Sequence, residues 1–213
     1  MSRPNRSRAA RLLVMGLALL LSGCGALKRC AYEGFERDRW QQPERVVADL
    51  ALAPGARVAD LGAGGGYFTF RLARAVGPAG LVYAVDVDAS MVDFLTEEAA
   101  EQKLDNVRPV LAGSDDPRLP ERVDLVFTSN TYHHLESRAA YFSALRERSL
   151  AAGGRVAIVE YRPDATSHAT ARETIEEEMA EAGFRLAKSF DYLERQHFLV
   201  FEVAGGNPEE PAR

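Results

Sequence analysis

Short apolar runs alternate with amphipathic segments along most of the chain. Runs rich in Val, Leu and Ala predict strands at residues 57–61, 81–87, 107–111, 123–129 and 155–160. Apolar positions at helical spacing predict helices at residues 43–53, 68–76, 90–103, 137–150 and 166–182. Ser90 is the expected N-cap of the helix at residues 90–103. Strands that alternate with helices in this way are typical of a parallel sheet, because a crossover helix returns the chain to the same edge.

The end of the chain departs from this alternation. Residues 184–191 and 197–204 read as two strands with too few residues between them for a crossover helix, so they must run antiparallel. The predicted fold is therefore α/β: a doubly wound, mostly parallel seven-stranded sheet covered on both faces, with a C-terminal antiparallel hairpin. The predicted domain spans residues 43–204, and the Gly-, Pro- and Glu-rich residues 205–213 form a loose tail.

The first 23 residues have the pattern of an export signal. Four arginines precede an apolar run, Leu12–Leu21, of about ten residues, which is short of the roughly 20 that span a bilayer. Residues 21–24, Leu-Ser-Gly-Cys, resemble the bacterial lipobox, which implies that Cys24 is lipidated and becomes the new N-terminus. Gly25 then implies an outer-membrane destination. On this interpretation residues 24–42 are a lipidated tether that could also form a lid.

Composition narrows the possible functions. Hydrophobic residues make up 46% of the chain and charged residues 27%, as in ordinary globular domains. The formal net charge of −5 argues against a nucleic-acid binder with a basic face. The two cysteines, Cys24 and Cys30, are too few for a disulfide framework or a metal cluster, so no metal site is expected.

The candidate ligand site follows the first predicted strand. Asp60, Gly62, Gly64 and Gly66 form the pattern D-x-G-x-G-x-G, which places free backbone N–H groups at a helix N-terminus. The dinucleotide pattern G-x-G-x-x-G fails because Tyr67 stands at its last position, which disfavours an NAD-dependent oxidoreductase. The phosphate loop fails because no Lys follows. Asp86, twenty positions after Gly66, ends the second strand and could accept hydrogen bonds from ribose hydroxyls.

These residues resemble motif I of the class I S-adenosylmethionine-dependent methyltransferases. The resemblance implies that the glycine loop packs against the methionine part of S-adenosylmethionine and that Asp60 helps to hold its amino group. It extends from about residue 36 to 204 and implies the Rossmann-like methyltransferase fold. Residues 150–155, Leu-Ala-Ala-Gly-Gly-Arg, resemble the family's turn before the fifth strand, with Ala152 in place of the usual Pro.

Further cofactor and catalytic candidates follow the third and fourth strands. Ser114 occupies the position at which many family members have an acid near the adenine amino group, and Asp115 is the next candidate. The segment from Thr128 to Leu135 lines the floor near the transferable methyl group in the family, which makes Asn130 a cofactor-binding candidate. His133 and His134 lie in this segment, and either could act as a base near neutral pH or simply pack against the next helix.

Other residues could border the acceptor. Glu160 and Tyr161 follow the fifth strand and could form pocket walls, and Trp40 lies in a segment that could fold over the site or pack on the domain edge. Two adjacent histidines without a spaced third ligand argue against a metal site at these residues. No motif identifies the acceptor or the oligomeric state.

Two hypotheses follow. The first is a membrane-anchored enzyme that transfers a methyl group from S-adenosylmethionine to a small-molecule or lipid-like acceptor. The second is an exported lipoprotein that keeps the fold without catalysis and uses the cleft to bind another adenosine compound or a protein partner. The second addresses a conflict, since S-adenosylmethionine is made in the cytoplasm and a processed lipoprotein faces the periplasmic side. An anchor that faces the cytoplasm is the alternative location.

Overall fold

The computed structural model describes residues 36–167 and 169–205. The predicted signal peptide, Cys24, most of the tether and the tail after residue 205 lie outside the described residues. Within the described part of the chain, none of the helices has the length and apolar character needed to cross a membrane.

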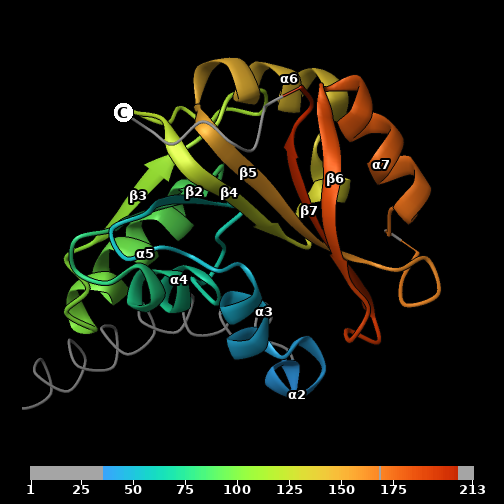
Figure 1. The fold of residues 1–213 in the computed structure, drawn as a ribbon. Helices are drawn as coiled ribbons and strands as arrows, with labels where there is room; N and C mark the ends of the chain where they lie inside the picture. The colour runs from blue at the N-terminus through green and yellow to red at the C-terminus, as the bar shows by residue number, and fades with distance from the viewer. Residues whose placement is uncertain (1–35, 168, 206–213) are drawn as a thin grey trace, which may run out of the picture. The chain divides into compact units, whose positions relative to one another are not determined.

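A single seven-stranded sheet organises the described domain (Figure 1). Its strands, in spatial order, are β3 (Val107–Leu111), β2 (Leu81–Asp86), β1 (Arg57–Leu61), β4 (Val123–Ser129), β5 (Leu150–Tyr161), β7 (Gln196–Val203) and β6 (Phe184–Phe190). The first five pair in parallel, and β7 pairs antiparallel with both β5 and β6. The predicted fold class is confirmed. The insertion of β7 between β5 and β6 is the arrangement that the family resemblance implies.

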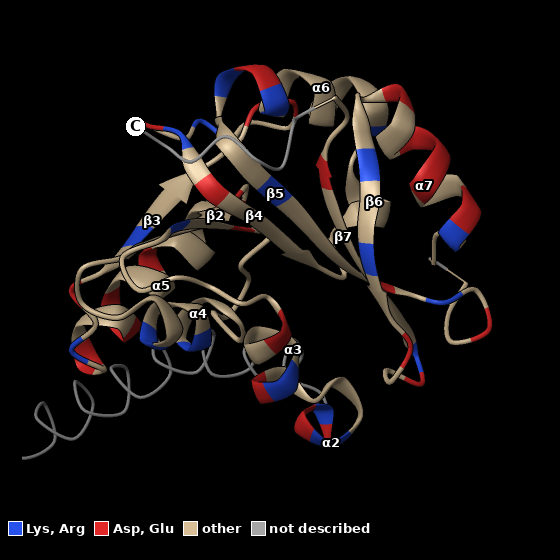
Figure 2. Cartoon of the chain, in the orientation of Figure 1, with Lys and Arg blue, Asp and Glu red and all other residues tan. Residues whose placement is uncertain are grey.

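Helices cover both faces of this sheet. They are α2 (Arg37–Gln41), α3 (Pro43–Asp49), α4 (Thr69–Val76), α5 (Ala89–Glu101), the 3-10 turn η1 (Tyr132–His134), α6 (Arg138–Arg148) and α7 (Arg172–Glu181). Helices α3, α4 and α5 lie on one face, and α6 and α7 lie on the other (Figure 1). Charged residues concentrate on the helices and loops, whereas the central strands are mostly uncharged (Figure 2).

Strand alternation produces two separate cores. Successive side chains of a strand point to opposite faces, so Val58 packs with Leu72 and Leu95 under α4 and α5, whereas Ala59 packs with residues of α6 and α7 such as Phe142 and Met179. Because both faces are covered, the central strands are apolar on both sides. The polar side chains at the ends of these strands are therefore the candidates for a site.

The structure corrects several predicted boundaries. Helix α5 is capped by Asp88, whose carboxylate accepts a hydrogen bond from Ser90 N, so Ser90 is not the N-cap. Strand β5 begins at Leu150, and α7 begins at Arg172. Helix α2 was not predicted, because its sequence, Arg-Asp-Arg-Trp-Gln, has no apolar stripe.

Candidate active site

The loop after β1 meets the segment after β4 at the carboxyl edge of the sheet. Gly62 has φ +71°, and a Cβ atom placed there would lie 2.1 Å from Thr131 Oγ1. The backbone N–H groups of Gly62 and Ala63 both donate to the Val85 carbonyl, which ties the loop to β2. Only glycine combines this backbone conformation with such a close approach.

The need for glycine differs among the other positions of the loop. Gly64 and Gly66 also have positive φ, +52° and +80°. A Cβ atom at Gly66 would lie 2.3 Å from the Phe70 ring and 2.9 Å from Leu95, whereas one at Gly65 would meet nothing within 4 Å. The loop therefore needs glycine at some of its positions for the fold itself.

This contrast gives a first prediction. Gly66→Ala should lower the free energy of unfolding by about 2 kcal/mol, from the positive φ and the contact with Phe70 together. Gly65→Ala is the matched control and should change it by less than about 0.5 kcal/mol. Urea unfolding of the two variants and the parent measures both values. Equal losses in the two variants would contradict this account of the loop.

Asp60 is a buried carboxylate at the base of the loop. Its side chain is only 3% exposed and accepts a hydrogen bond from Thr69 Oγ1 at 2.6 Å. Burial raises the pKa of Asp60 from 3.8 to about 6, although the bond from Thr69 and the nearby charge of Arg37 both lower it. A carboxylate in this state gains from a cationic ligand, which would offset its lost hydration.

Asp86 lies at the end of β2 and holds the loop from the other side. Asp86 Oδ2 accepts from Gly64 N at 2.8 Å, and Oδ1 accepts from Asp88 N at 2.9 Å. The side chain is partly exposed, and each carboxylate oxygen has a second lone pair. Asp86 can therefore accept further hydrogen bonds from ligand hydroxyls while it orients the glycine loop.

His133 forms a buried pair with Glu160. His133 Nδ1 lies 2.8 Å from Glu160 Oε1, and Glu160 is fully buried at the end of β5. Glu160 also accepts hydrogen bonds from His133 N at 3.3 Å and Tyr161 N at 2.8 Å. Because an ionised carboxylate only accepts, Nδ1 carries the proton, which makes Nε2 the proton-accepting atom when the ring is neutral.

His134 has a different position from its neighbour. It is exposed, and its ring centre lies 4.0 Å from that of His133. The structure thus separates the two candidates by their surroundings, since His133 is the one that a buried carboxylate orients.

Helix α2 makes contacts along the same edge. Tyr67 OH donates to Asp38 at 2.5 Å, and Gln41 Nε2 donates to Ser129 Oγ at 2.9 Å. The rings of Trp40 and Tyr161 stack with centres 6.0 Å apart. The helix is therefore attached to the glycine loop, the end of β4 and the end of β5.

Arg37 is the innermost charge of α2. Its guanidinium lies 3.7 Å from the centre of the Tyr67 ring. Burial lowers the pKa of Arg37, and the negative charge of Asp60 is among the influences that raise it. No sequence signal marked this residue, because α2 itself was not predicted.

The two remaining cofactor candidates have other partners or surroundings. Asn130 has φ +56°, and its Oδ1 accepts from Gln196 Nε2 at 2.6 Å, so its side chain is linked to β7. Asp115 is exposed in the loop after β3. Burial raises the pKa of Tyr141 in helix α6, and the negative charges of Asp116 and Asp115 raise it further. The contacts of the described residues do not join Asp115 to the glycine loop.

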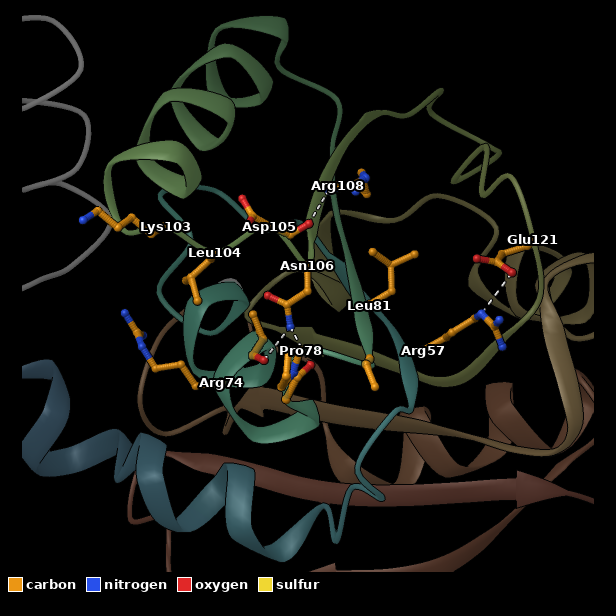
Figure 3. A pocket seen from close by; sticks show the side chains of 14 residues that line it. Arg57, Arg74, Pro78, Leu81, Lys103, Leu104, Asp105, Asn106, Arg108 and Glu121 are labelled. Atoms are coloured by element: carbon orange, nitrogen blue, oxygen red, sulfur yellow. Dashed lines mark hydrogen bonds and ion pairs between the residues drawn. The ribbon is translucent and has the colours of Figure 1, made fainter.

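A separate cavity of about 570 Å³ lies at the opposite, amino edge of the sheet (Figure 3). Its basic lining residues are Arg57, Arg74, Lys103 and Arg108. The Asn106 amide donates to the carbonyls of Ala73 and Gly77 at the end of α4, and Arg57 pairs with Glu121 at 3.0 Å. These contacts stabilise helix and strand ends, away from the glycine loop.

The described residues contain no cluster of three or more His, Cys, Asp or Glu side chains placed to hold a metal ion. The candidate groups at the carboxyl edge are the buried Asp60, the His133–Glu160 pair, and Asp86, which can accept hydrogen bonds from ribose hydroxyls. These side chains fit a ligand with a cationic group and a ribose.

Comparison with known proteins finds similarity to methyltransferases. Residues 52–199 match a family model described as a methyltransferase domain. Arsenite methyltransferase of Halobacterium salinarum is 35% identical over 112 residues, which cover 52% of this chain and 28% of that protein. Demethylmenaquinone methyltransferase of Staphylococcus aureus is 30% identical over 135 residues, 59% of this chain and 51% of that protein.

A solved structure shares the fold at lower identity. A SAM-dependent methyltransferase from Aquifex aeolicus superposes with a TM-score of 0.77 at 21% identity, covering 84% of this chain and 98% of that one. The chain spans about a quarter to a half of the length of the two curated relatives.

Proposed function

Because the chain belongs to the methyltransferase-domain family, we propose that it is a SAM-dependent methyltransferase that methylates an ionisable group of a small or lipid-like acceptor, with His133 as the base. The observation that carries this proposal is the 2.8 Å contact between His133 Nδ1 and Glu160 Oε1. It gives the carboxyl edge a proton acceptor with a fixed tautomer, which is the group that an ionisable acceptor requires.

The residues of the cofactor site have distinct roles in this proposal. S-adenosylmethionine supplies an electrophilic methyl group on a sulfonium centre. Asp60 would hold the cationic part of the cofactor beside the glycine loop. Asp86 accepts hydrogen bonds from the ribose. Much of the rate enhancement in such a displacement comes from the positions in which these residues hold the two reactants.

The proton is handled by the pair at the end of β5. His133 Nε2 takes the proton from the acceptor while a lone pair of the acceptor atom attacks the methyl carbon. Glu160 stabilises the imidazolium that forms. Glu160 is a positioning residue, since it acts through His133. His134 is exposed and has no part in this proposal.

The acceptor is an organic molecule in this proposal. One relative is named for arsenite, a soft metalloid that thiolates bind well. The only cysteines of this chain are Cys24 and Cys30, which precede the domain. A nitrogen or oxygen acceptor suits His133 better than a thiolate-bound metalloid.

Calorimetry and product analysis test the proposed function together. Titration of the full chain with S-adenosylmethionine should show binding in the micromolar range, and incubation with acceptors should release S-adenosylhomocysteine. The absence of a heat change, together with unchanged thermal stability at saturating cofactor, would refute the proposal.

We also propose that Cys24 is lipidated and anchors the domain, with the outer membrane as the favoured location. The support is the sequence pattern alone: the run Leu12–Leu21 followed by Leu-Ser-Gly-Cys. Mass spectrometry of the membrane fraction should find a diacylated N-terminal Cys24, and Cys24→Ala should move the chain out of that fraction. An intact N-terminus in the membrane fraction would contradict lipidation.

A further inference from the structure

We propose that the acceptor is a planar aromatic molecule with an ionisable hydroxyl group, and that its ring binds in the pocket bordered by Trp40 and Tyr161. This inference rests on the proposed function, because it names the substrate class of the same site. The pocket has a volume of about 510 Å³, within the range of small-molecule sites. Its other lining residues include Asp164, Thr166, Glu194 and Arg195.

Chain connections join this pocket to the catalytic pair. Tyr161 is the last residue of β5, and its backbone N–H donates to Glu160 Oε1 at 2.8 Å. The same carboxylate oxygen contacts His133 Nδ1. Trp40, whose ring stacks on that of Tyr161, precedes Gln41, which donates a hydrogen bond to Ser129 at the end of β4. Both aromatic residues of the pocket are therefore attached to the carboxyl edge of the sheet, where the glycine loop lies.

The buried part of the pocket is aromatic. Trp40 and Tyr161 are partly buried, and their rings lie near parallel, with an interplanar angle of 30°. Asp164, Glu194 and Arg195 are exposed, so solvent and salt screen their charges. A flat ring gains most from such a surface, because offset stacking adds to the burial of apolar area.

Charges of both signs surround Tyr161. Arg195 lies with its guanidinium 5.5 Å from the Trp40 ring centre. Burial raises the pKa of the Tyr161 phenol, the positive charges of Arg37 and Arg195 act to lower it, and the negative charge of Glu160 acts to raise it. These charges do not select the reacting group of the acceptor, so the ionisable hydroxyl follows from the proposed base, His133, which can take its proton.

The reaction on such an acceptor balances without another reactant. His133 Nε2 takes the hydroxyl proton, and the oxygen forms a bond to the methyl carbon. The carbon–sulfur bond breaks, and its electron pair stays on the sulfur, which becomes neutral. The products are an aryl methyl ether and S-adenosylhomocysteine, and the proton passes from His133 to water.

Trp40 is the only tryptophan of the chain, so its fluorescence reports on this pocket alone. Catechol added to the full chain with bound S-adenosylhomocysteine should quench that fluorescence with saturation. trans-1,2-Cyclohexanediol, which carries two hydroxyls on a ring that is not planar, is the matched control ligand and should quench at least about tenfold more weakly. Tyr161→Leu should weaken catechol binding by about tenfold and leave the affinity for S-adenosylhomocysteine unchanged, whereas Tyr83→Phe, at the amino edge, should change neither.

Two separate readings distinguish the ways in which this could fail. If S-adenosylhomocysteine binds by calorimetry but catechol does not quench, or if ethanolamine is methylated and catechol is not, the aromatic acceptor is wrong and the proposed function stands. If S-adenosylhomocysteine does not bind, the proposed function fails, and this inference fails with it.

Discussion

Replacing Asp60 by asparagine is expected to weaken S-adenosylmethionine binding about tenfold to a hundredfold. The carboxylate is buried beside the glycine loop, and hydrogen bonds to charged groups contribute about 1.5–3 kcal/mol. Asparagine keeps the shape and the contact with Thr69 but loses the negative charge that attracts the cofactor. Isothermal titration of the variant and the parent at the same pH and salt concentration measures the change.

The same replacement is expected to stabilise the free protein at neutral pH. Burial raises the pKa of Asp60 from 3.8 to about 6, so the unfolded chain ionises this group at lower pH than the folded chain does. Between pH 3.8 and about 6 the free energy of unfolding therefore falls as the pH rises. Above pH 6 the folded protein bears the full cost of the buried charge, about 3 kcal/mol. Asp60→Asn avoids it.

A pH series of urea unfolding checks this second effect. The difference between variant and parent should be near zero at pH 4 and should grow until about pH 6 to 7. Asp105→Asn is the matched control, because Asp105 is exposed at the amino edge and should change stability by less than about 0.5 kcal/mol at any pH. A variant that is less stable than the parent at neutral pH would show that Asp60 serves the fold more than the ligand.

The parts of the site that are local in sequence could be predicted from the sequence. The loop from Asp60 to Gly66 is a strand-to-helix turn, whose conformation depends on residues within the turn itself. Asp86 follows from the register of the next strand. In such cases the residue types and their spacing determine the backbone path, and the backbone path places the side chain.

Contacts between distant segments could not be predicted in the same way. The sequence offers Glu160 only as a pocket wall, because its partner His133 lies 27 residues earlier, in a turn after another strand. Helix α2 is held by single polar contacts such as that of Gln41 with Ser129, not by an apolar stripe. The stacking of Trp40 on Tyr161 depends on the positions of helix α2 and of the end of β5. The aromatic pocket could therefore be identified only from the structure.

Local ambiguity explains a smaller error. Asp88 and Ser90 both suit a helix N-cap, and only the observed bond from Ser90 N to Asp88 Oδ1 decides between them. A shift of two residues there leaves the helix and the core unchanged. It does make Asp88 the residue that caps the helix.

Glu160→Gln is expected to lower kcat by about a hundredfold for an acceptor with a pKa near 10, with little change in the affinity for S-adenosylmethionine. The buried carboxylate fixes the proton on His133 Nδ1 and stabilises the imidazolium, and an amide does neither as well. Steady-state kinetics with catechol, with S-adenosylhomocysteine release as the readout, measures this loss.

The identity of the acceptor separates a catalytic effect from a structural one. 4-Nitrophenol is already ionised near neutral pH and needs no base. The Glu160→Gln and His133→Ala variants should therefore methylate it at nearly the rate at which the parent methylates it. A variant whose site is merely distorted would lose activity on both phenols alike. Glu121→Gln, a matched change at the amino edge where Glu121 accepts a bond from Tyr83, should leave both rates within about twofold. If Glu160→Gln slows both phenols equally, the pair has a structural role, and proton removal must be assigned elsewhere.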